Sequence, residues 1–205
     1  MKGVFITLEG PEGSGKTTLI SRLAQAAQGD FDEVLVTREP GDGPAGPSIR
    51  KVLLEGSSLD PWTETFLFLA DRAQHCREVI RPALGRGALV LCDRFADSTL
   101  AYQGYARGLN IEVLRQLNDL ATGEVRPDLT LLLDLDPAVG LNRLGAKDRL
   151  DQEPIEFHRA VREGFLAESR RDPGRYRVLD ASLSADEVFQ AALQEMRRLF
   201  EPTRL

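Results

Sequence analysis

Residues 10–17 have the pattern of a phosphate-binding loop, the stretch whose residue types and spacing point most directly to chemistry. They match G-x-x-x-x-G-K-[ST] in full, after an apolar run and before a helical pattern. The glycines let backbone N–H groups converge on a phosphate, the helix dipole favours its charge, and Lys16 reaches the β- and γ-phosphates. A glycine-rich turn without a ligand is disfavoured by these flanks, so we predict that the chain binds a nucleoside triphosphate. The residues expected to bind it are Gly10, Pro11, Glu12, Gly13, Ser14, Gly15, Lys16, Thr17 and Thr18.

Two oxygen ligands for Mg²⁺ are expected beside this loop. The Thr17 hydroxyl binds the ion in such motifs. Asp93, at the end of an apolar run, can hold Mg²⁺ through water or accept a proton from an acceptor phosphate; capping the next helix is its structural alternative.

The loop is shared by kinases, GTPase switches and motor ATPases. The guanine-specifying N-K-x-D pattern does not occur in the sequence, and 205 residues leave little room for the extra modules of most motor ATPases. A small kinase is therefore the leading class, with an ATP-binding switch that transfers nothing as the alternative from another class.

Two arginines follow neighbouring apolar runs and could hold a phosphorylated acceptor. Arg38 follows residues 33–37, and Arg94 follows residues 88–92. Ligands of open α/β sheets bind beyond the carboxyl ends of the strands, and the guanidinium fork suits bidentate phosphate binding. Pairing of each arginine with a nearby carboxylate is the alternative.

Residues 143–153 are predicted to form a lid that closes over ATP and supplies cations, since residues 11–14 contain no arginine. Arg143 and Lys147 are four residues apart and should share a helical face, with Arg149 close behind. A solvated, charge-rich loop is the alternative.

Glu12 is a carboxylate inside an anion-binding loop and repels the ligand unless it faces another group, such as a sugar hydroxyl. Simple exposure of Glu12 to solvent is the alternative.

Strand and helix patterns alternate along the chain. Apolar runs predict strands at 4–8, 33–37, 88–92, 129–134 and 176–179, and helical patterns cover 17–27, 48–55, 61–84, 97–121 (two helices), 138–144, 154–170 and 184–200. Continuous apolar strands separated by helices are typical of a parallel sheet covered on both faces. We predict an α/β fold with five parallel strands, in a single domain over residues 1–205.

The composition excludes several classes of protein. A net charge of −6 argues against nucleic-acid binding, and no apolar run approaches the length of a membrane helix. Cys76 and Cys92 lack metal-site spacing and are expected to be buried thiols in a reducing compartment, so a cytoplasmic location is predicted.

Seven segments together make the chain similar to thymidylate kinase of the bacterial type, a P-loop kinase of the nucleoside monophosphate kinase superfamily. They are residues 9–18 (E-G-P-E-G-S-G-K-T-T), 37–41 (T-R-E-P-G), 67–72 (L-F-L-A-D-R), 93–95 (D-R-F) with Ser98, 101–108 (A-Y-Q-G-Y-A-R-G), 126–130 (R-P-D-L-T) and 148–153 (D-R-L-D-Q-E). They span nearly the whole chain in the family's order.

The resemblance assigns roles to residues of the acceptor site. It implies that Phe68 stacks on thymine and that Arg72 hydrogen-bonds a base carbonyl. Thr99 and Gln103 would read the base edge, and Tyr102 would favour a deoxyribose. Glu12 would meet the 3′-hydroxyl, and Arg38 and Arg94 would hold the 5′-phosphate. The remaining acceptor-site residues are Arg50, Ser98 and Pro40, the last in an expected cis Glu39–Pro40 turn.

The same resemblance implies the reaction and the assembly. The expected reaction is ATP- and Mg²⁺-dependent phosphorylation of dTMP to dTDP in dTTP biosynthesis, by in-line transfer. Lys16, Asp93, Arg94 and a lid cation are its expected catalytic residues, with Arg149 favoured over Arg143 and Lys147. A homodimer through residues 61–84 and 97–121 is also implied. A kinase for another nucleoside monophosphate or a deoxynucleoside is the nearest alternative.

Overall fold

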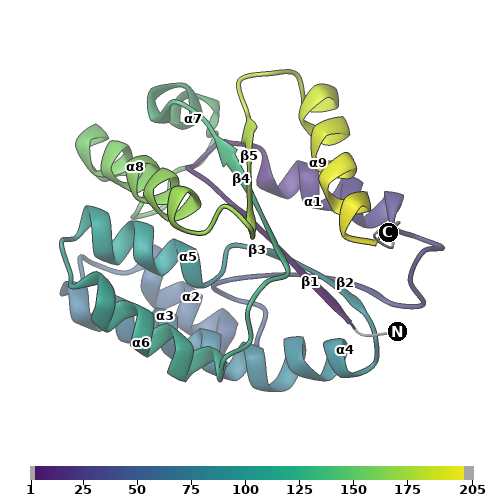
Figure 1. Cartoon of the computed structure of the whole chain (residues 1–205). Coiled ribbons are helices and arrows are strands. Elements are labelled where there is room, and N and C mark those ends of the chain that lie inside the picture. Colours follow the sequence, from purple (N-terminus) through teal and green to yellow (C-terminus); the bar gives the residue numbers. More distant parts are fainter. Residues whose placement is uncertain (1–2, 201–205) are drawn as a thin grey trace.

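Five parallel strands form the centre of the molecule, as predicted (Figure 1). The computed structural model describes residues 3–200. The strands are β1 (Val4–Glu9), β2 (Val34–Arg38), β3 (Leu89–Asp93), β4 (Leu129–Asp134) and β5 (Tyr176–Asp180), in the order β2-β3-β1-β4-β5. Arg38 and Asp93 are the last residues of their strands and pair in register. The sheet therefore brings these two polar residues to one edge.

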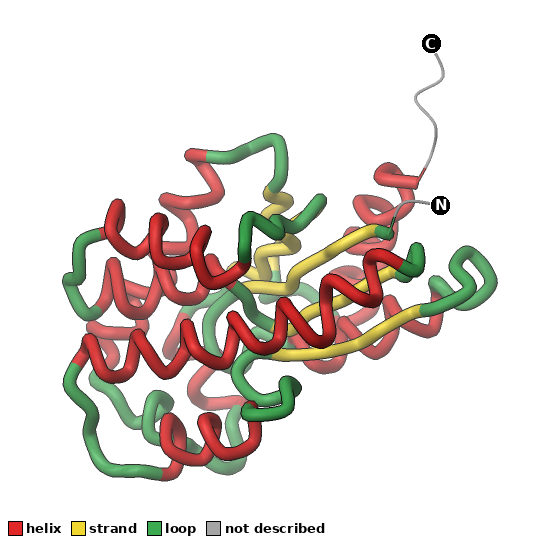
Figure 2. Tube along the Cα trace, turned by 90° about the horizontal axis from the view of Figure 1, so that it is seen from below, coloured by secondary structure: helices red, strands yellow, loops and turns green. Residues whose placement is uncertain are grey.

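Helices cover both faces of the sheet because side chains alternate along its buried strands (Figure 2). On β3, Leu89 and Leu91 pack into the core shared with α1 (Lys16–Ala26) and α9 (Ala185–Phe200). Val90 and Cys92 point into a second core with the helical residues Ile80 and Ala83. The fold thus has the two covered faces that the apolar strands predicted.

The remaining helices pack around the sheet. They are α2 (Gly46–Glu55), α3 (Pro61–His75), the π-helical turn η1 (Cys76–Ile80), α4 (Arg81–Gly85), α5 (Ala96–Thr99), the π-helical turn η2 (Leu100–Ala106), α6 (Ile111–Thr122), α7 (Pro137–Arg143) and α8 (Ile155–Arg171). The helix predicted over 61–84 contains the η1 turn just before Pro82, whose missing N–H interrupts the regular hydrogen bonding.

Cys76 and Cys92 are buried free thiols, as predicted. Between residues 3 and 200, no helix combines the length and the apolar character that crossing a membrane requires. The single domain over 1–205 stays a prediction, and residues 1–2 and 201–205 lie outside the described part of the chain.

Candidate active site

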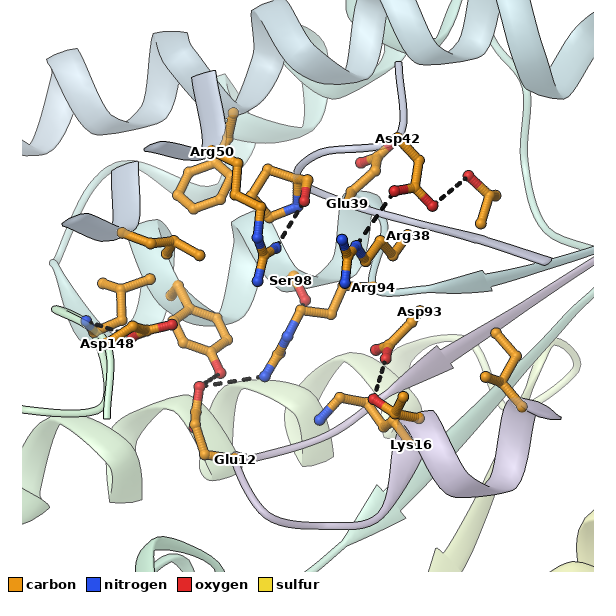
Figure 3. A pocket seen from close by; sticks show the side chains of 18 of the residues that line it. Glu12, Lys16, Arg38, Glu39, Asp42, Arg50, Asp93, Arg94, Ser98 and Asp148 are labelled. Carbon is orange, nitrogen blue, oxygen red and sulfur yellow. Dashed lines mark hydrogen bonds and ion pairs between the residues drawn. The ribbon is translucent and has the colours of Figure 1, made fainter. Parts of the chain in front are cut away.

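A pocket of about 570 Å³ opens beyond the carboxyl ends of β1, β2 and β3. The phosphate-binding loop forms one side of it, α3 and η2 form another, and the segment after α7 contributes Leu144, Asp148, Leu150 and Asp151. Figure 3 shows Arg38, Arg50, Arg94 and Lys16 pointing toward the same part of this pocket. The sheet therefore gathers residues from distant parts of the sequence into one place.

The phosphate-binding loop turns sharply between β1 and α1. Gly10, Gly13 and Gly15 have φ values of 141°, 66° and 93°, which glycine adopts without strain. A Cβ on Gly13 would lie 2.1 Å from the carbonyl oxygen of Gly140, so the loop packs directly on α7. The loop thus has the geometry that its glycines predicted.

Lys16 is buried against its own loop. Its Nζ donates to the carbonyl oxygens of Gly10 at 3.0 Å and Pro11 at 2.8 Å, and to Ser14 Oγ at 3.2 Å. Burial, then the nearby positive charge of Arg94, lower the pKa of Lys16 to about 8. The amine is thus held in place at the pocket wall by three oxygen acceptors.

Thr17 and Asp93, the two predicted oxygen ligands, lie side by side. The Thr17 hydroxyl donates to Asp93 Oδ2 at 3.0 Å. The contact forms because β1 and β3 are neighbours in the sheet, and Asp93 pairs with Leu8 just before the loop. Two oxygen donors therefore face the same side of the pocket.

Arg94 occupies a left-handed turn with φ 67°, which aims its side chain at the loop. Its guanidinium donates to Gly10 O and to Glu12 Oε1, both at 3.2 Å. The turn is fixed from behind by Glu9, which accepts from the Phe95 backbone N at 2.8 Å and from Ser98 Oγ at 2.6 Å. Burial, then the negative charge of Asp97, raise the pKa of Glu9 to about 8.

Arg38 and Arg50 stand close together on the other side of the pocket. Arg38 Nε lies 3.3 Å from Asp42 Oδ1, and Arg50 donates to the carbonyl oxygen of Pro40 at 2.8 Å. Burial and then the positive charge of Arg38 lower the pKa of Arg50. The Glu39–Pro40 bond between them in sequence is cis, as the resemblance implied. Two repelling cations that face one pocket suit an anionic ligand.

The far end of the pocket is buried and rich in hydrogen bonds. Arg72 is 1% exposed. It donates to Glu39 Oε2 at 2.8 Å, to Thr99 Oγ1 at 2.7 Å and to Asn118 Oδ1 at 2.8 Å. Phe68 lies four residues before it on α3 and lines the same pocket, together with Gln103. This end offers an aromatic ring and oriented polar groups.

Glu12 is buried, so the alternative that it is simply exposed to solvent is wrong. It accepts hydrogen bonds from the Tyr102 hydroxyl and from Arg94, and its Oε2 lies 3.4 Å from His158 Nδ1. Burial alone would raise the pKa of Glu12, but His158, Arg94 and Lys16 together lower it well below its usual range. The carboxylate is therefore an anion fixed by cationic and hydroxyl neighbours.

Arg143 and Lys147 do not share one helical face, so that prediction is wrong. Helix α7 ends at Arg143 because Leu144 turns to an extended conformation with φ −77° and ψ 130°, so Lys147 lies in an irregular segment. Arg143 Nη1 reaches Gly13 O of the phosphate-binding loop at 3.4 Å. Arg149 instead pairs with Glu64 and donates to Leu53 O at 2.8 Å.

Comparison with known proteins identifies the family of the chain. A sequence model of the thymidylate kinase family matches residues 8–192. The chain belongs to the thymidylate kinase family.

Relatives in this family resemble the chain over most of its length. Thymidylate kinase of Deinococcus radiodurans is 52% identical over 191 residues, which cover 91% of this chain and 93% of that protein. Thymidylate kinase of Thermomicrobium roseum is 52% identical, covering 95% of this chain and 96% of that one. The crystal structure of thymidylate kinase from Ehrlichia chaffeensis matches with a TM-score of 0.80 at 34% identity, covering 96% and 99%.

Several carboxylates and polar groups behind the pocket were not predicted from the sequence. Sequence reasoning assigned no role to Glu9, Glu39, Glu64, Asn118 and His158, each of which contacts a predicted site residue. Signals were available for two of them, Glu9 and Glu64. Glu9 ends an apolar strand, and Glu64 and Phe68 are four apart on one helical pattern that also holds Arg72. For Asn118 and His158 no local signal exists.

Proposed function

We propose that the protein transfers the γ-phosphoryl group of ATP to dTMP, giving ADP and dTDP, a step of dTTP biosynthesis. The observation that carries this proposal is one pocket that joins a phosphate-binding loop, converging arginines and a buried end with Phe68 and Arg72. A donor nucleotide at the loop and a phosphorylated acceptor at the arginines would meet between Lys16 and Arg94. The family of the chain and the names of its relatives support the same reaction.

The residues at the loop fit a Mg²⁺ ion. The hydroxyl of Thr17 and the carboxylate of Asp93 are hard oxygen donors held 3.0 Å apart, and Mg²⁺ prefers such ligands while it keeps several waters. These two residues would hold the ion, which supplies charge neutralisation at the transferring phosphates when bound.

The residues of the pocket would position the two phosphates for in-line transfer. Arg38, Arg94 and Arg50 would bind the acceptor phosphate, one of whose oxygens attacks the γ-phosphorus while the bond to the β–γ bridging oxygen breaks. ADP leaves with that electron pair. Lys16 and Arg94 would stabilise the charge on the transferred group, so catalysis rests on positioning and electrostatics.

Acceptor selection would occur at the other residues of the pocket. Phe68 would stack on the base, Arg72 would donate to a base carbonyl, and Thr99 and Gln103 would face the base edge. Glu12 and Tyr102, which are hydrogen-bonded to each other, would contact the deoxyribose. Ser98 and Pro40 would support the acceptor phosphate through Arg94 and Arg50, to which they are bonded.

The segment 143–153 would act as a lid over the donor phosphates. Arg143 already touches the loop, whereas Arg149 would have to leave Glu64 to reach a phosphate. Lys147 is exposed on the same segment. We propose that Arg143 supplies charge in the structure as it stands and that Arg149 does so only when the lid moves.

A coupled ADP-release assay tests the reaction. The purified chain receives MgATP with dTMP, dUMP, dCMP, AMP, UMP or thymidine, and Lys16→Ala is the blank. Turnover strongest with dTMP and lost in the blank is expected. Turnover of thymidine without dTMP would point to a deoxynucleoside kinase. ATP binding without transfer to any acceptor would favour a switch.

We further propose that the protein is a cytoplasmic homodimer. Exposed apolar side chains gather on α3 and α6, which pack side by side: Trp62 and Phe66 on α3, and Val113 and Leu120 on α6. Trp62 and Phe66 stack with ring centroids 5.8 Å apart. Sedimentation should give the mass of two chains; a monomer at micromolar concentration would contradict the dimer.

A further inference from the structure

Two rows of side chains face each other at the buried end of the pocket. The residues of each row are four apart, a spacing that places them on one side of a helical segment. The rows are Glu64, Phe68 and Arg72 on α3, and Thr99, Gln103 and Arg107 on α5, η2 and the residue after it. Arg72 bonds Thr99 at 2.7 Å, and Gln103 bonds Glu64 at 2.9 Å. The rows are therefore joined on both sides of Phe68.

Glu64 is the charged centre of this contact. Its side chain is 0% exposed, yet it carries a carboxylate. Two guanidinium groups balance that charge: Arg107 Nε lies 3.4 Å from Oε1, and Arg149 Nη2 bonds Oε2. Arg149 is held in addition by Leu53 O. The carboxylate is thus fixed by groups outside the pocket and remains an acceptor of hydrogen bonds.

The carboxylate determines how the amide of Gln103 is oriented. An ionised carboxylate only accepts hydrogen bonds, so the amide nitrogen of Gln103 must face it, as its 2.9 Å bond to Glu64 Oε1 shows. Gln103 is 1% exposed and lines the pocket. The carbonyl oxygen of Gln103 is consequently the part of the amide left for a ligand.

We propose that Glu64 is a specificity-determining positioning residue, which selects the base of the acceptor by fixing the amide of Gln103. The inference rests on the proposed function. A base with an N–H at position 3, such as thymine, can donate to the Gln103 oxygen. Cytosine presents an acceptor at the same position. Two acceptors facing each other without a proton in a buried site are unfavourable.

Exchange of Glu64 for Gln removes this constraint. A glutamine at position 64 can donate as well as accept, so the Gln103 amide can turn over and offer its NH₂ group to the pocket. The Glu64→Gln protein should then tolerate cytosine. We expect the ratio of kcat/KM for dTMP to that for 5-methyl-dCMP to fall about tenfold or more, the usual effect of satisfying one buried polar group.

The two nucleotides make the comparison sharp because they share the sugar, the phosphate and the 5-methyl group and differ only at the N3–C4 edge. Both are assayed by ADP release with the full-length wild type and with Glu64→Gln. Glu153→Gln is the matched control, since Glu153 pairs with Arg107 at 2.6 Å but does not touch Gln103. This control should keep the wild-type ratio.

Thermal melting separates positioning from structural support. A purely structural role for Glu64 would lower Tm and leave the nucleotide ratio at its wild-type value, and that result would overturn the proposal. Should Glu64→Gln fail to fold, Glu64→Asp keeps the charge for both arginines but withdraws the carboxylate from Gln103 by one methylene. Its ratio should also fall, and an unchanged ratio would likewise overturn the role of Glu64.

The outcomes for the two proposals are distinct. A wild-type protein that does not phosphorylate dTMP contradicts the proposed function. A wild-type protein that phosphorylates dTMP, together with variants whose ratio is unchanged, leaves the proposed function intact and contradicts only the inference about Glu64.

Discussion

The pocket has two ends, which hold their cations in different ways. The phosphate end contains Lys16, Arg38 and Arg50, and the base end contains Phe68 and Arg72. Arg38 has 56% of its side chain exposed and one carboxylate 3.3 Å away. Arg72 is 1% exposed and makes four hydrogen bonds between 2.7 and 3.0 Å. The base end is thus formed before a ligand binds, whereas the phosphate end keeps positive charge available.

The chemistry of the two halves of a nucleotide explains this difference. A phosphate carries its own negative charge, so an arginine that binds it must keep part of its guanidinium accessible even where one protein carboxylate lies nearby, as for Arg38. A base is neutral, so a cation beside it must already have its partners, because a buried charge without them is costly. Glu39 supplies that partner to Arg72, and its other oxygen, Oε1, lies 2.9 Å from His75 Nδ1.

The largest contrast should appear in stability. Arg72→Met removes a buried guanidinium and leaves the Glu39 carboxylate and Asn118 without their donor, so the free energy of unfolding should fall by about 3–5 kcal/mol. Arg38→Met, in an exposed pair, should lower it by about 1 kcal/mol or less while raising KM for dTMP. Urea unfolding followed by circular dichroism measures both.

Equal losses of stability in the two variants would contradict this contrast between the ends. The double variant Arg72→Met/Glu39→Gln provides the control. It should recover part of the loss, because the carboxylate left behind is then neutral. If no stability is recovered, the loss in Arg72→Met comes from the missing contacts with Thr99 and Asn118 and not from the unpaired carboxylate.

Much of the fold and of the phosphate end could be predicted from the sequence. Each strand lies within one residue of its predicted bounds, because a buried parallel strand is a continuous apolar run. Arg38 and Asp93 pair in register at strand ends, and the rule that ligands bind beyond such ends located the pocket. The buried cysteines also agree with prediction, whereas the cis bond before Pro40 was implied only by the family resemblance.

The partners of buried carboxylates could not be predicted in this way. Arg149 and Glu64 are 85 residues apart in sequence, and no local pattern indicates that they meet. The end of α7 was missed for a different reason: spacing alone gave Arg143 and Lys147 one face, but Leu144 leaves the helix. Long-range ion pairs and helix ends depend on tertiary contacts that a single sequence does not display.

Substitutions in the lid should affect the phosphate end of the pocket and leave the base end unchanged. Arg143 touches the loop that holds the donor phosphates, so Arg143→Ala should lower kcat about a hundredfold, as loss of one group that stabilises developing charge does. Lys147→Ala is the matched control and should have a much smaller effect. KM for dTMP should change little in either variant, since the base end is untouched.

Steady-state kinetics with saturating MgATP measures these effects. A larger loss in Lys147→Ala than in Arg143→Ala would contradict the placement of Arg143 at the donor phosphates. A large loss in Arg149→Ala, with Arg143→Ala near wild type, would show that the lid moves and that Arg149 leaves Glu64 during turnover.

The smallest effect should be a dependence on pH that belongs to the phosphate end alone. Lys16 must be charged to bind ATP, and its pKa in the free protein is lowered to about 8 by burial and Arg94. The charged form therefore predominates below pH 8 and is lost above it. Since kcat/KM reports the free enzyme, kcat/KM for MgATP should fall about tenfold per pH unit above about pH 8.

Two variants distinguish Lys16 from Glu9, whose pKa is also about 8 and whose charge acts on the lysine. Lys16→Arg should be slow but without this decline, because a guanidinium stays charged throughout the range. Glu9→Gln should keep the decline. Affinity for dTMP, measured calorimetrically, should vary much less over the same range, since guanidinium groups in general stay charged there. A matching fall in dTMP affinity would mean that the two ends titrate together, and that the base end is not independent of the loop.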